Sequence, residues 1–374
     1  MATITPWEVK GDIDYSKLIK DFGLKTLDGV KLPKVFLDNV LFRRGLIYAH
    51  RDFDKILDAI KNKKPFVMMT GLMPSGKMHF GHLMVAKQMV FYQKMGAKIY
   101  ITVADIEAYN SRIPDMKKLR EVAIEEYLTN YVALGLDLKK CDFYFQSKRS
   151  LDGAKSNAYY SLSNMLARHA TFNEFKAVYG KISPGKMASS LLQASDMLHA
   201  QLPEFEGKAM PVVIPVGSDQ DPHIRLARDI CTRIKEFKFN KISSTYHKFC
   251  PGLKGGKMSS SDPLSYIALN DTSKEAARKI KKYAFSGGQA TLEEHRKKGG
   301  NPDIDVSFQM LMYGLEEDDK KLQEIYKDYK SGKLLSGELK KILIDKITLF
   351  LDEHHKKKEK SRKVVEKFVK DKGF

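Results

Sequence analysis

The sequence predicts an α/β protein built on a doubly wound parallel sheet, with an N-terminal extension before the sheet and a C-terminal α-helical domain after it. Between residues 65 and 271, short apolar and β-branched runs of strand length alternate with stretches whose apolar residues recur at helical spacing. From residue 272 onward the strand-like runs stop, and segments rich in Lys and Glu follow. The expected parts are therefore 1–64, 65–271 and 272–374.

The composition indicates a globular chain of about two domains. Of 374 residues, 43% are hydrophobic and 30% are charged, and the formal net charge of +19 favours a polyanionic partner, although it also promotes solubility. The three cysteines form no C-x-x-C pair, so we expect buried reduced thiols. Without a run of about 18 apolar residues or a signal peptide, we expect a cytoplasmic protein that makes no membrane contact.

The extension over 1–64 is expected to pack on the sheet domain. It carries a predicted helix around Tyr15 to Phe22 and three arginines, Arg43, Arg44 and Arg51. These arginines either reach a phosphate or pair with acidic neighbours such as Asp52, and the second is the more usual fate of a charged cluster.

The first predicted strand, Pro65 to Thr70, leads through a loop into a helix from Leu83 to Met95 that stops at Gly96. The loop is rich in turn residues, namely Gly71, Pro74, Ser75 and Gly76. A helix that begins after such a loop directs free backbone N–H groups and a partial positive charge at it. The loop is therefore expected to bind anionic oxygen atoms.

Two further strands are predicted at 97–105 and 142–146, with helices between them at about 116–133. Crossovers of this length suit right-handed connections between parallel strands. Because ligands bind outside the carboxyl ends of such strands, the segments Met69 to Gly76 and Asp105 to Glu107 should converge on one cleft.

Residues from about 150 to 205 fit a helical insertion, interrupted at Gly180, Pro184 and Pro203. A strand at 210–217 and a helix at about 224–237 then repeat the strand, polar cluster and helix pattern. Asp219 and Gln220 end that strand, a position from which polar side chains select a small substrate.

A second motif, Gly255 to Pro263, combines two glycines, Lys257 and the hydroxyls of Ser259, Ser260 and Ser261. These residues suit a mobile phosphate cradle. Alone, they also fit a solvated Gly/Ser linker. The earlier motif His79-Phe80-Gly81-His82 makes chance a poor explanation.

The two motifs resemble the signatures of class I aminoacyl-tRNA synthetases, in the same order and at a fitting separation. Within that class, the chain resembles the tryptophanyl-tRNA synthetases of the archaeal and eukaryotic type over about residues 5–350. The stretches that carry this resemblance are Pro6-Trp7, Phe42-Arg43-Arg44-Gly45, Asp219-Gln220-Asp221-Pro222, Phe285-Ser286-Gly287-Gly288 and Thr291-Leu292-Glu293-Glu294-His295-Arg296. The resemblance implies that 65–271 is the Rossmann-like catalytic domain of this class.

The implied reaction activates L-tryptophan with ATP and transfers it to tRNA(Trp), which requires charge stabilisation rather than a covalent nucleophile. The resemblance assigns catalytic roles to His79, His82, Lys257 and Ser259. It implies that Lys257 and Ser259 hold the leaving pyrophosphate together with Mg²⁺. It places ATP also against Gly71, Pro74, Ser75, Gly76, Gly81, Met258 and Ser261. The family is homodimeric. Two histidines at i and i+3 also suit a metal, but no third ligand stands at ligand spacing.

The chain departs from the family pattern in two places. Ser260 replaces the second lysine of the Lys-Met-Ser motif, where Lys254 is a possible substitute. Met69 and Thr102 stand where a Tyr and a Gln are expected to face the indole N–H. Residues 193–198 instead resemble the bacterial form, in which an Asp on this helix accepts that N–H. The expected tryptophan site is therefore Met69, Thr70, Glu107, Gln193, Asp196 and Gln220; the alternative for Asp196 is an exposed helix residue.

The C-terminal part, 272–374, is expected to contain helices at 273–283, 318–329 and 337 to about 355, and then a basic tail at 356–363. The resemblance makes it the anticodon-binding domain. Three alternatives to the tryptophan enzyme remain: a tyrosyl-tRNA synthetase of the same class, a catalytically silent RNA-binding relative, and a small-molecule nucleotidyltransferase.

Overall fold

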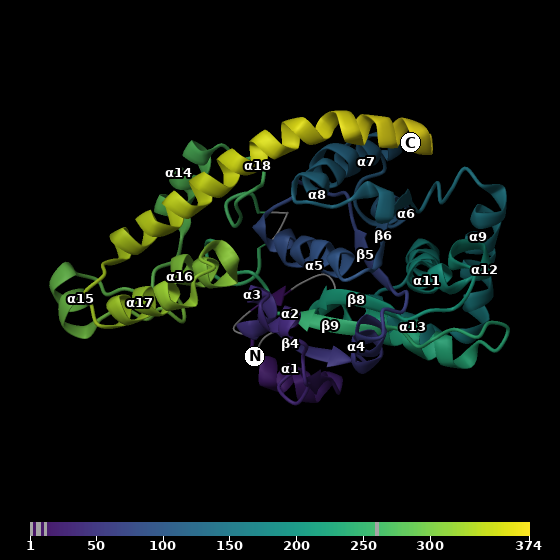
Figure 1. Cartoon of the computed structure of the whole chain (residues 1–374), viewed down its shortest axis with the longest axis horizontal. Helices are drawn as coiled ribbons and strands as arrows, with labels where there is room; N and C mark the ends of the chain where they lie inside the picture. The colour runs from purple at the N-terminus through teal and green to yellow at the C-terminus, as the bar shows by residue number, and fades with distance from the viewer. Residues whose placement is uncertain (1–2, 5–8, 11–12, 259–261) are drawn as a thin grey trace.

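A seven-stranded sheet forms the centre of the computed structural model (Figure 1), which describes residues 3–4, 9–10, 13–258 and 262–374. The strand order is β3-β4-β9-β8-β5-β6-β7. The strands are β3 (Lys25–Thr26), β4 (Ile47–Arg51), β5 (Val67–Leu72), β6 (Lys98–Val103), β7 (Cys141–Phe145), β8 (Val212–Gly217) and β9 (Ser243–His247). A separate antiparallel pair is formed by β1 (Thr3–Ile4) and β2 (Val9–Lys10).

The doubly wound arrangement is confirmed. Strands β5 to β9 are mutually parallel in the order β9-β8-β5-β6-β7. The chain builds outward from β5 to β7 and then returns to the other side of β5 with β8, so the strand order reverses between β5 and β8. Ligands of such sheets bind outside the carboxyl ends of the strands at this reversal.

The N-terminal extension does more than pack on the sheet. Its strands β3 and β4 continue the sheet in the antiparallel direction, with β4 paired to β9. The extension also contributes the helices α1 (Tyr15–Phe22), α2 (Lys34–Leu37), α3 (Val40–Arg43) and α4 (Asp54–Lys61). The sequence predicted α1 but neither strand. Pro6 and Trp7 lie outside the described residues.

Alternate strand residues enter two separate cores, one on each face of the sheet. Met68 belongs to the first core, whereas Val67 and Met69 belong to the second. The first face is covered by α5 (Leu83–Lys94), η2 (Ala123–Leu128) and α8 (Thr129–Ala133), and the second by α9 (Gly153–Leu166), α10 (Phe172–Tyr179), α11 (Pro184–Leu198) and α13 (Asp221–Arg233). The predicted helical insertion is thus the main cover of the second face.

The remaining connections are short helices: η1 (Phe80–His82), α6 (Asp105–Ser111), α7 (Met116–Val122), η3 (Leu138–Lys140), η4 (Ala167–His169), η5 (His199–Gln201), α12 (Pro203–Glu206) and η6 (Ser218–Gln220). Residue 180 shows why the insertion is segmented. Gly180 has a φ of +66° and ends α10, a conformation that favours glycine.

The C-terminal part is helical. The prediction that its last helix ends at about residue 355 and is followed by a basic tail was wrong. Its elements are α14 (Ser273–Tyr283), α15 (Leu292–Lys298), α16 (Val306–Met310), η7 (Leu311–Leu315), α17 (Asp319–Lys330) and α18 (Ser336–Lys372). Helix α18 continues through the segment expected to be a tail, and Figure 1 shows it reaching back over the sheet domain. It packs on α8 and α14.

Ion pairs connect this helical part to the rest of the chain. Arg362 Nη1 of α18 lies 2.7 Å from Glu125 Oε2, and both Arg43 and Arg44 pair with Asp319 at 2.6 Å. Arg51 likewise pairs with an acid, Asp221, at 3.0 Å. The structure therefore supports acidic partners for the three N-terminal arginines, although none of them is Asp52.

The three cysteines are buried and free, as expected. Within the part of the chain that the structure describes, none of the helices combines the length and apolar character needed to cross a membrane.

Candidate active site

A cleft of about 880 Å³ opens at the carboxyl ends of the parallel strands. The predicted site residues that line it are Met69, Thr70, Gly71, Ser75, His79, Gly81, His82, Glu107, Gln193, Asp196, Gln220, Lys257 and Met258. Pro74 and Gly76 belong to the same loop but do not line the cleft, and Ser259 and Ser261 lie outside the described residues. Segments far apart in sequence therefore meet in one place, as the strand-end argument predicted.

The two histidines of the first motif are locked in orientation by backbone N–H groups. The N–H of His79 donates to Nδ1 of His82 at 3.1 Å, and that of Gly81 donates to Nδ1 of His79 at 3.2 Å. Burial, followed by the charges of neighbouring residues, lowers the pKa of His79 to about 2 and that of His82 to about 4. Both rings are therefore neutral at pH 7, and each carries its proton on Nε2.

Gly81 is needed for this arrangement. A Cβ at residue 81 would lie 2.9 Å from Cε1 of His79, closer than side-chain carbons approach each other. The resemblance placed Gly81 only against ATP; the structure adds the close approach of the His79 ring.

The second motif lines the same cleft as the first. Lys257 Nζ is 2.6 Å from Asp219 Oδ2 and 4.7 Å from the centre of the Phe249 ring. Lys254, the suggested substitute for the missing second lysine, pairs instead with Asp262 at 2.8 Å, is exposed and does not line the cleft. Within the described part of this loop, Lys257 is the lysine that faces the cleft.

Backbone hydrogen bonds join the histidine motif to the segment that follows the lysine loop. The N–H of Phe80 donates to the carbonyl of Ile267 at 3.1 Å, and the N–H of Leu269 donates to the carbonyl of Met78 at 2.9 Å. The ring of Tyr266 also lies against His79, with 4.9 Å between ring centres. The segment that follows the lysine loop is thus fixed directly to the histidine motif.

Asp196 lies at the other end of the cleft and is fully buried, not exposed on its helix. Its Oδ1 accepts hydrogen bonds from the hydroxyls of Tyr144 at 2.7 Å and Tyr159 at 2.8 Å, and its Oδ2 accepts one from Gln146 Nε2 at 2.8 Å. Burial raises the pKa of Asp196 to about 6, against these hydrogen bonds, which lower it. A carboxylate offers about four acceptor positions, so Oδ2 retains one for a ligand.

Three more polar groups of the predicted tryptophan site line the cleft. Burial, and secondly the charge of Asp196, raises the pKa of Glu107 to about 7. The Oε1 atom of Gln193 is buried without a hydrogen-bond partner among the described residues, as expected of a group that awaits a donor such as an ammonium. Gln220 Nε2 lies 3.5 Å from Asp219 Oδ2, close to Lys257.

Sequence reasoning missed the side chains that hold Asp196. Tyr144, Gln146 and Tyr159 come from β7, the residue after it and α9. Gln146 alone was accessible to the strand-end argument, because it is the last residue of the strand predicted at 142–146. Arg112 was also missed; it lines the cleft and its Nη1 donates to the Ser75 hydroxyl at 3.3 Å.

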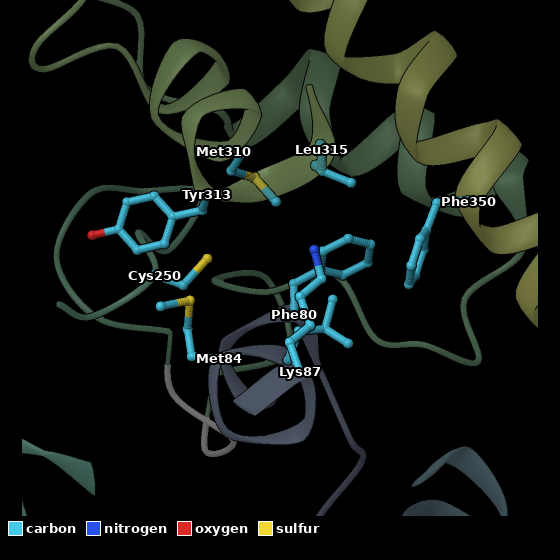
Figure 2. A pocket seen from close by; sticks show the side chains of 9 residues that line it. Phe80, Met84, Lys87, Cys250, Met310, Tyr313, Leu315 and Phe350 are labelled. Atoms are coloured by element: carbon cyan, nitrogen blue, oxygen red, sulfur yellow. The ribbon is translucent and has the colours of Figure 1, made fainter. Parts of the chain in front are cut away.

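A second, much smaller cavity lies between the histidine motif and the C-terminal helices. Figure 2 shows Phe80, Met84 and Lys87 facing Met310, Tyr313, Leu315 and Phe350 across it. Its volume is about 20 Å³, room for about one water molecule. The Phe80 and Phe350 rings lie 5.3 Å apart, and Lys87 Nζ donates to the carbonyl of Gly314 at 3.1 Å. This region joins the two parts of the chain and has no room for a substrate.

Among the described residues, no three His, Cys, Asp or Glu side chains come close enough to hold a metal ion together. Mg²⁺ is commonly held by substrate phosphates with one or two carboxylates rather than by a full protein cage.

Comparison with known proteins places this cleft in a family. Residues 61–352 match the family described as tRNA synthetases class I (W and Y). The chain is 44% identical to a tryptophan–tRNA ligase from Methanocaldococcus jannaschii, covering 100% of this chain and 99% of that protein. It is 42% identical to one from Hyperthermus butylicus, with 99% of both chains covered.

Solved structures give the same result. The tryptophanyl-tRNA synthetase of Aeropyrum pernix matches with a TM-score of 0.88 and 41% identity, and the match covers 95% of each chain. A tryptophanyl-tRNA synthetase from Encephalitozoon cuniculi bound to tryptophan matches with a TM-score of 0.78 and 28% identity, covering 93% of this chain and 95% of that one.

Proposed function

The chain belongs to the class I tRNA synthetases of the tryptophan and tyrosine group, and we propose that it is a tryptophan–tRNA ligase in which the two loops bind ATP and helix α11 selects the amino acid. The ligase activity follows from relatives of this function that match essentially the whole chain. The observation that carries the division of roles is the meeting of both motifs and Asp196 in one cleft.

In the first step, a carboxylate oxygen of tryptophan attacks the α-phosphorus of ATP, the bond from that phosphorus to the bridging oxygen breaks, and pyrophosphate leaves. His79 and His82 donate Nε2–H hydrogen bonds to phosphate oxygens and, being neutral, add no charge. Lys257 supplies a positive charge to the leaving pyrophosphate. Such preorganised donors stabilise the charge that develops in the transition state.

A Mg²⁺ ion bound beside Lys257 would neutralise part of the phosphate charge. Ser259 and Ser261 remain predicted phosphate ligands from sequence alone. In the second step, a ribose hydroxyl at the tRNA 3′ end attacks the activated carbonyl and AMP leaves.

At the amino-acid end, Asp196 Oδ2 accepts the indole N–H, while Glu107, Gln193 and Gln220 position the ammonium and carboxylate of the substrate. The hydrogen-bonded cage around Asp196 supports this role because it fixes the acceptor before the ligand arrives. Phenylalanine has no N–H for the remaining acceptor position of this buried carboxylate, and leaving that position without a donor is costly, so phenylalanine is rejected.

The C-terminal helices are assigned to anticodon binding, and the net charge of +19 suits the tRNA backbone. The division at residue 272 remains a prediction, as do a cytoplasmic location and a homodimer. The helical insertion exposes Met165 and Phe172, which makes it the first surface to test in a dimer.

An aminoacylation assay with tRNA, ATP and labelled amino acid tests the proposal. Transfer of tryptophan but not tyrosine to tRNA is expected. Tyrosine transfer would identify the tyrosyl alternative, RNA binding without transfer the silent relative, and nucleotidyl transfer without tRNA charging the third alternative.

A further inference from the structure

We propose that Arg149 is a positioning residue for the amino-acid end of the cleft: its guanidinium holds the ring of Tyr144, and through it the carboxylate of Asp196. This inference rests on the proposed role of Asp196 as the indole acceptor. Arg149 itself is not among the residues that line the cleft, so it acts through its neighbours.

Arg149 is a buried charge, with 3% of its surface exposed. Nη2 lies 2.8 Å from Asp142 Oδ2, and Nε donates to Nε2 of His199 at 3.0 Å. The centre of the guanidinium lies 3.9 Å from the centre of the Tyr144 ring and 4.5 Å from that of Phe205. Burial of a cation is costly without compensation; here one carboxylate and three aromatic rings compensate for it, the third being Tyr100 with its ring centre 5.8 Å from the guanidinium.

The Tyr144 ring transmits this placement to the cleft. Its hydroxyl donates to Asp196 Oδ1 at 2.7 Å, so any tilt of the ring moves the hydroxyl that orients the carboxylate. Tyr144 has two rotatable side-chain bonds, and the guanidinium covers its ring at contact distance. The flat face of an arginine stacks on an aromatic ring in a way that the point charge of a lysine does not.

Arg149 also influences Asp196 through His199. Because His199 accepts the Arg149 N–H at Nε2, its own proton lies on Nδ1. That Nδ1 lies 2.9 Å from the carbonyl of Ser195 and 3.1 Å from the carbonyl of Asp196. Arg149 thus fixes the histidine tautomer that holds the backbone of α11 next to the proposed acceptor.

The opposite face of β7 provides a matched control. Tyr144 belongs to one core and Phe145 to the other, and the guanidinium of Arg120 lies 5.4 Å from the centre of the Phe145 ring. Arg120 is thus also an arginine over an aromatic ring of the same strand, but no described contact links it to Asp196.

The first test compares Arg149→Lys with Arg120→Lys in tryptophan-dependent pyrophosphate exchange. Arg149→Lys keeps the charge beside Asp142 but loses the stacked plane, so the KM for tryptophan should rise about tenfold while the KM for ATP stays within about twofold. Arg120→Lys should change neither. Equal tryptophan KM values in the two variants, or a parallel rise of both KM values in Arg149→Lys, would overturn the proposal.

A double-variant cycle tests the path through Tyr144. If Arg149 acts through the Tyr144 hydroxyl, Arg149→Lys should raise the tryptophan KM less in a Tyr144→Phe background than in the wild type. Equal factors in both backgrounds would overturn the path. Thermal melting of each variant monitors folding; if Arg149→Lys is unfolded where Arg120→Lys is folded, the role is structural and the proposal is wrong.

The variant Asp196→Asn distinguishes failure of the proposed indole acceptor from failure of the inference on Arg149. An unchanged tryptophan KM in Asp196→Asn removes the proposed acceptor, and the inference on Arg149 with it. A raised KM in Asp196→Asn together with no effect in Arg149→Lys overturns the inference on Arg149 alone.

Discussion

Lys257 Nζ lies 2.6 Å from Oδ2 of Asp219, so the charge of the second motif is paired with an acid at the end of β8. Asp219 is largely buried, whereas about a third of Lys257 is exposed. Phosphate oxygens that enter the cleft compete with this carboxylate for the ammonium. The pairing keeps the Lys257 ammonium beside the cleft. When pyrophosphate forms, the ammonium exchanges the Asp219 carboxylate for phosphate oxygens.

Lys257→Ala should reduce adenylate formation about 10²- to 10³-fold, the scale of one preorganised charge-stabilising donor. Pyrophosphate exchange at saturating tryptophan measures this. Lys254→Ala is the matched control, because Lys254 belongs to the same loop but pairs with Asp262 at the surface; its rate should stay close to wild type. Near-wild-type turnover of Lys257→Ala would show that the loop is not catalytic.

Glu107 predicts a pH dependence. Burial raises its pKa to about 7, and only the ionised form attracts the substrate ammonium. The kcat/KM for tryptophan, which reports the free enzyme, should therefore rise with pH through about 7 and level off above it. Glu107→Gln should lower the plateau and abolish this rise. A wild-type profile that is flat from pH 6 to 8 would contradict the role.

The raised pKa of Glu107 also affects the stability of the fold, which should fall with rising pH while activity rises. Because folding raises the pKa of Glu107 from 4.5 to about 7, the folded state binds more protons than the unfolded chain between these values. The free energy of unfolding therefore falls as pH rises through this window. Glu107→Gln should raise the Tm at a pH of about 8 relative to wild type, whereas a lower Tm would show that ionised Glu107 stabilises the fold.

Asp196→Asn should raise the KM for tryptophan about 10- to 100-fold, the range expected when a hydrogen bond to a charged group is lost, with little change in the KM for ATP. Asparagine retains one oxygen for the tyrosine hydroxyls, so it disturbs the surrounding cage less than alanine, which leaves three donors without a partner. Steady-state exchange kinetics for each substrate provide the measurement. Unchanged tryptophan kinetics would remove Asp196 from the pocket.

The affinity for tRNA should fall steeply with salt, because Lys and Arg contacts to phosphates release counterions. Between about 50 and about 200 mM salt the dissociation constant should rise by at least about tenfold. The KM for tryptophan should change far less over this range. A flat dependence would contradict the use of the excess positive charge for tRNA.

Strands β5 to β8 were predictable because their residues form apolar runs with turn residues after them. Strand β9 was not, since its sequence from Ser243 to His247 is polar. The strand is nevertheless buried throughout. Its hydroxyls are satisfied internally: Ser243 donates to the carbonyl of Asp52 at 2.7 Å and Ser244 to the hydroxyl of Tyr246 at 3.0 Å. The partner of Ser243 lies 191 positions away in the sequence, and such a contact leaves no periodic signal.

In the cleft, too, contacts between residues far apart in the sequence could not be predicted. The ends of the predicted strands indicated that the first loop, Glu107 and Gln220 come together, and the family resemblance added the lysine loop. Neither gave any sign that Asp196 is caged by Tyr144, Gln146 and Tyr159, because those contacts depend on how α9 and α11 pack against β7. The prediction of a basic tail after residue 355 was wrong for a related reason. Contacts such as that from Lys358 Nζ to Asn270 Oδ1, at 2.7 Å, hold α18 on the catalytic part. Composition alone suggested a solvated segment there.

A crystal structure of the protein with bound tryptophan tests the central claim most directly. The indole nitrogen should lie within about 3.2 Å of Oδ2 of Asp196, with Tyr144, Tyr159 and Gln146 still bonded to that carboxylate. An indole nitrogen that faces another acceptor, with Asp196 closed behind its cage, would contradict it.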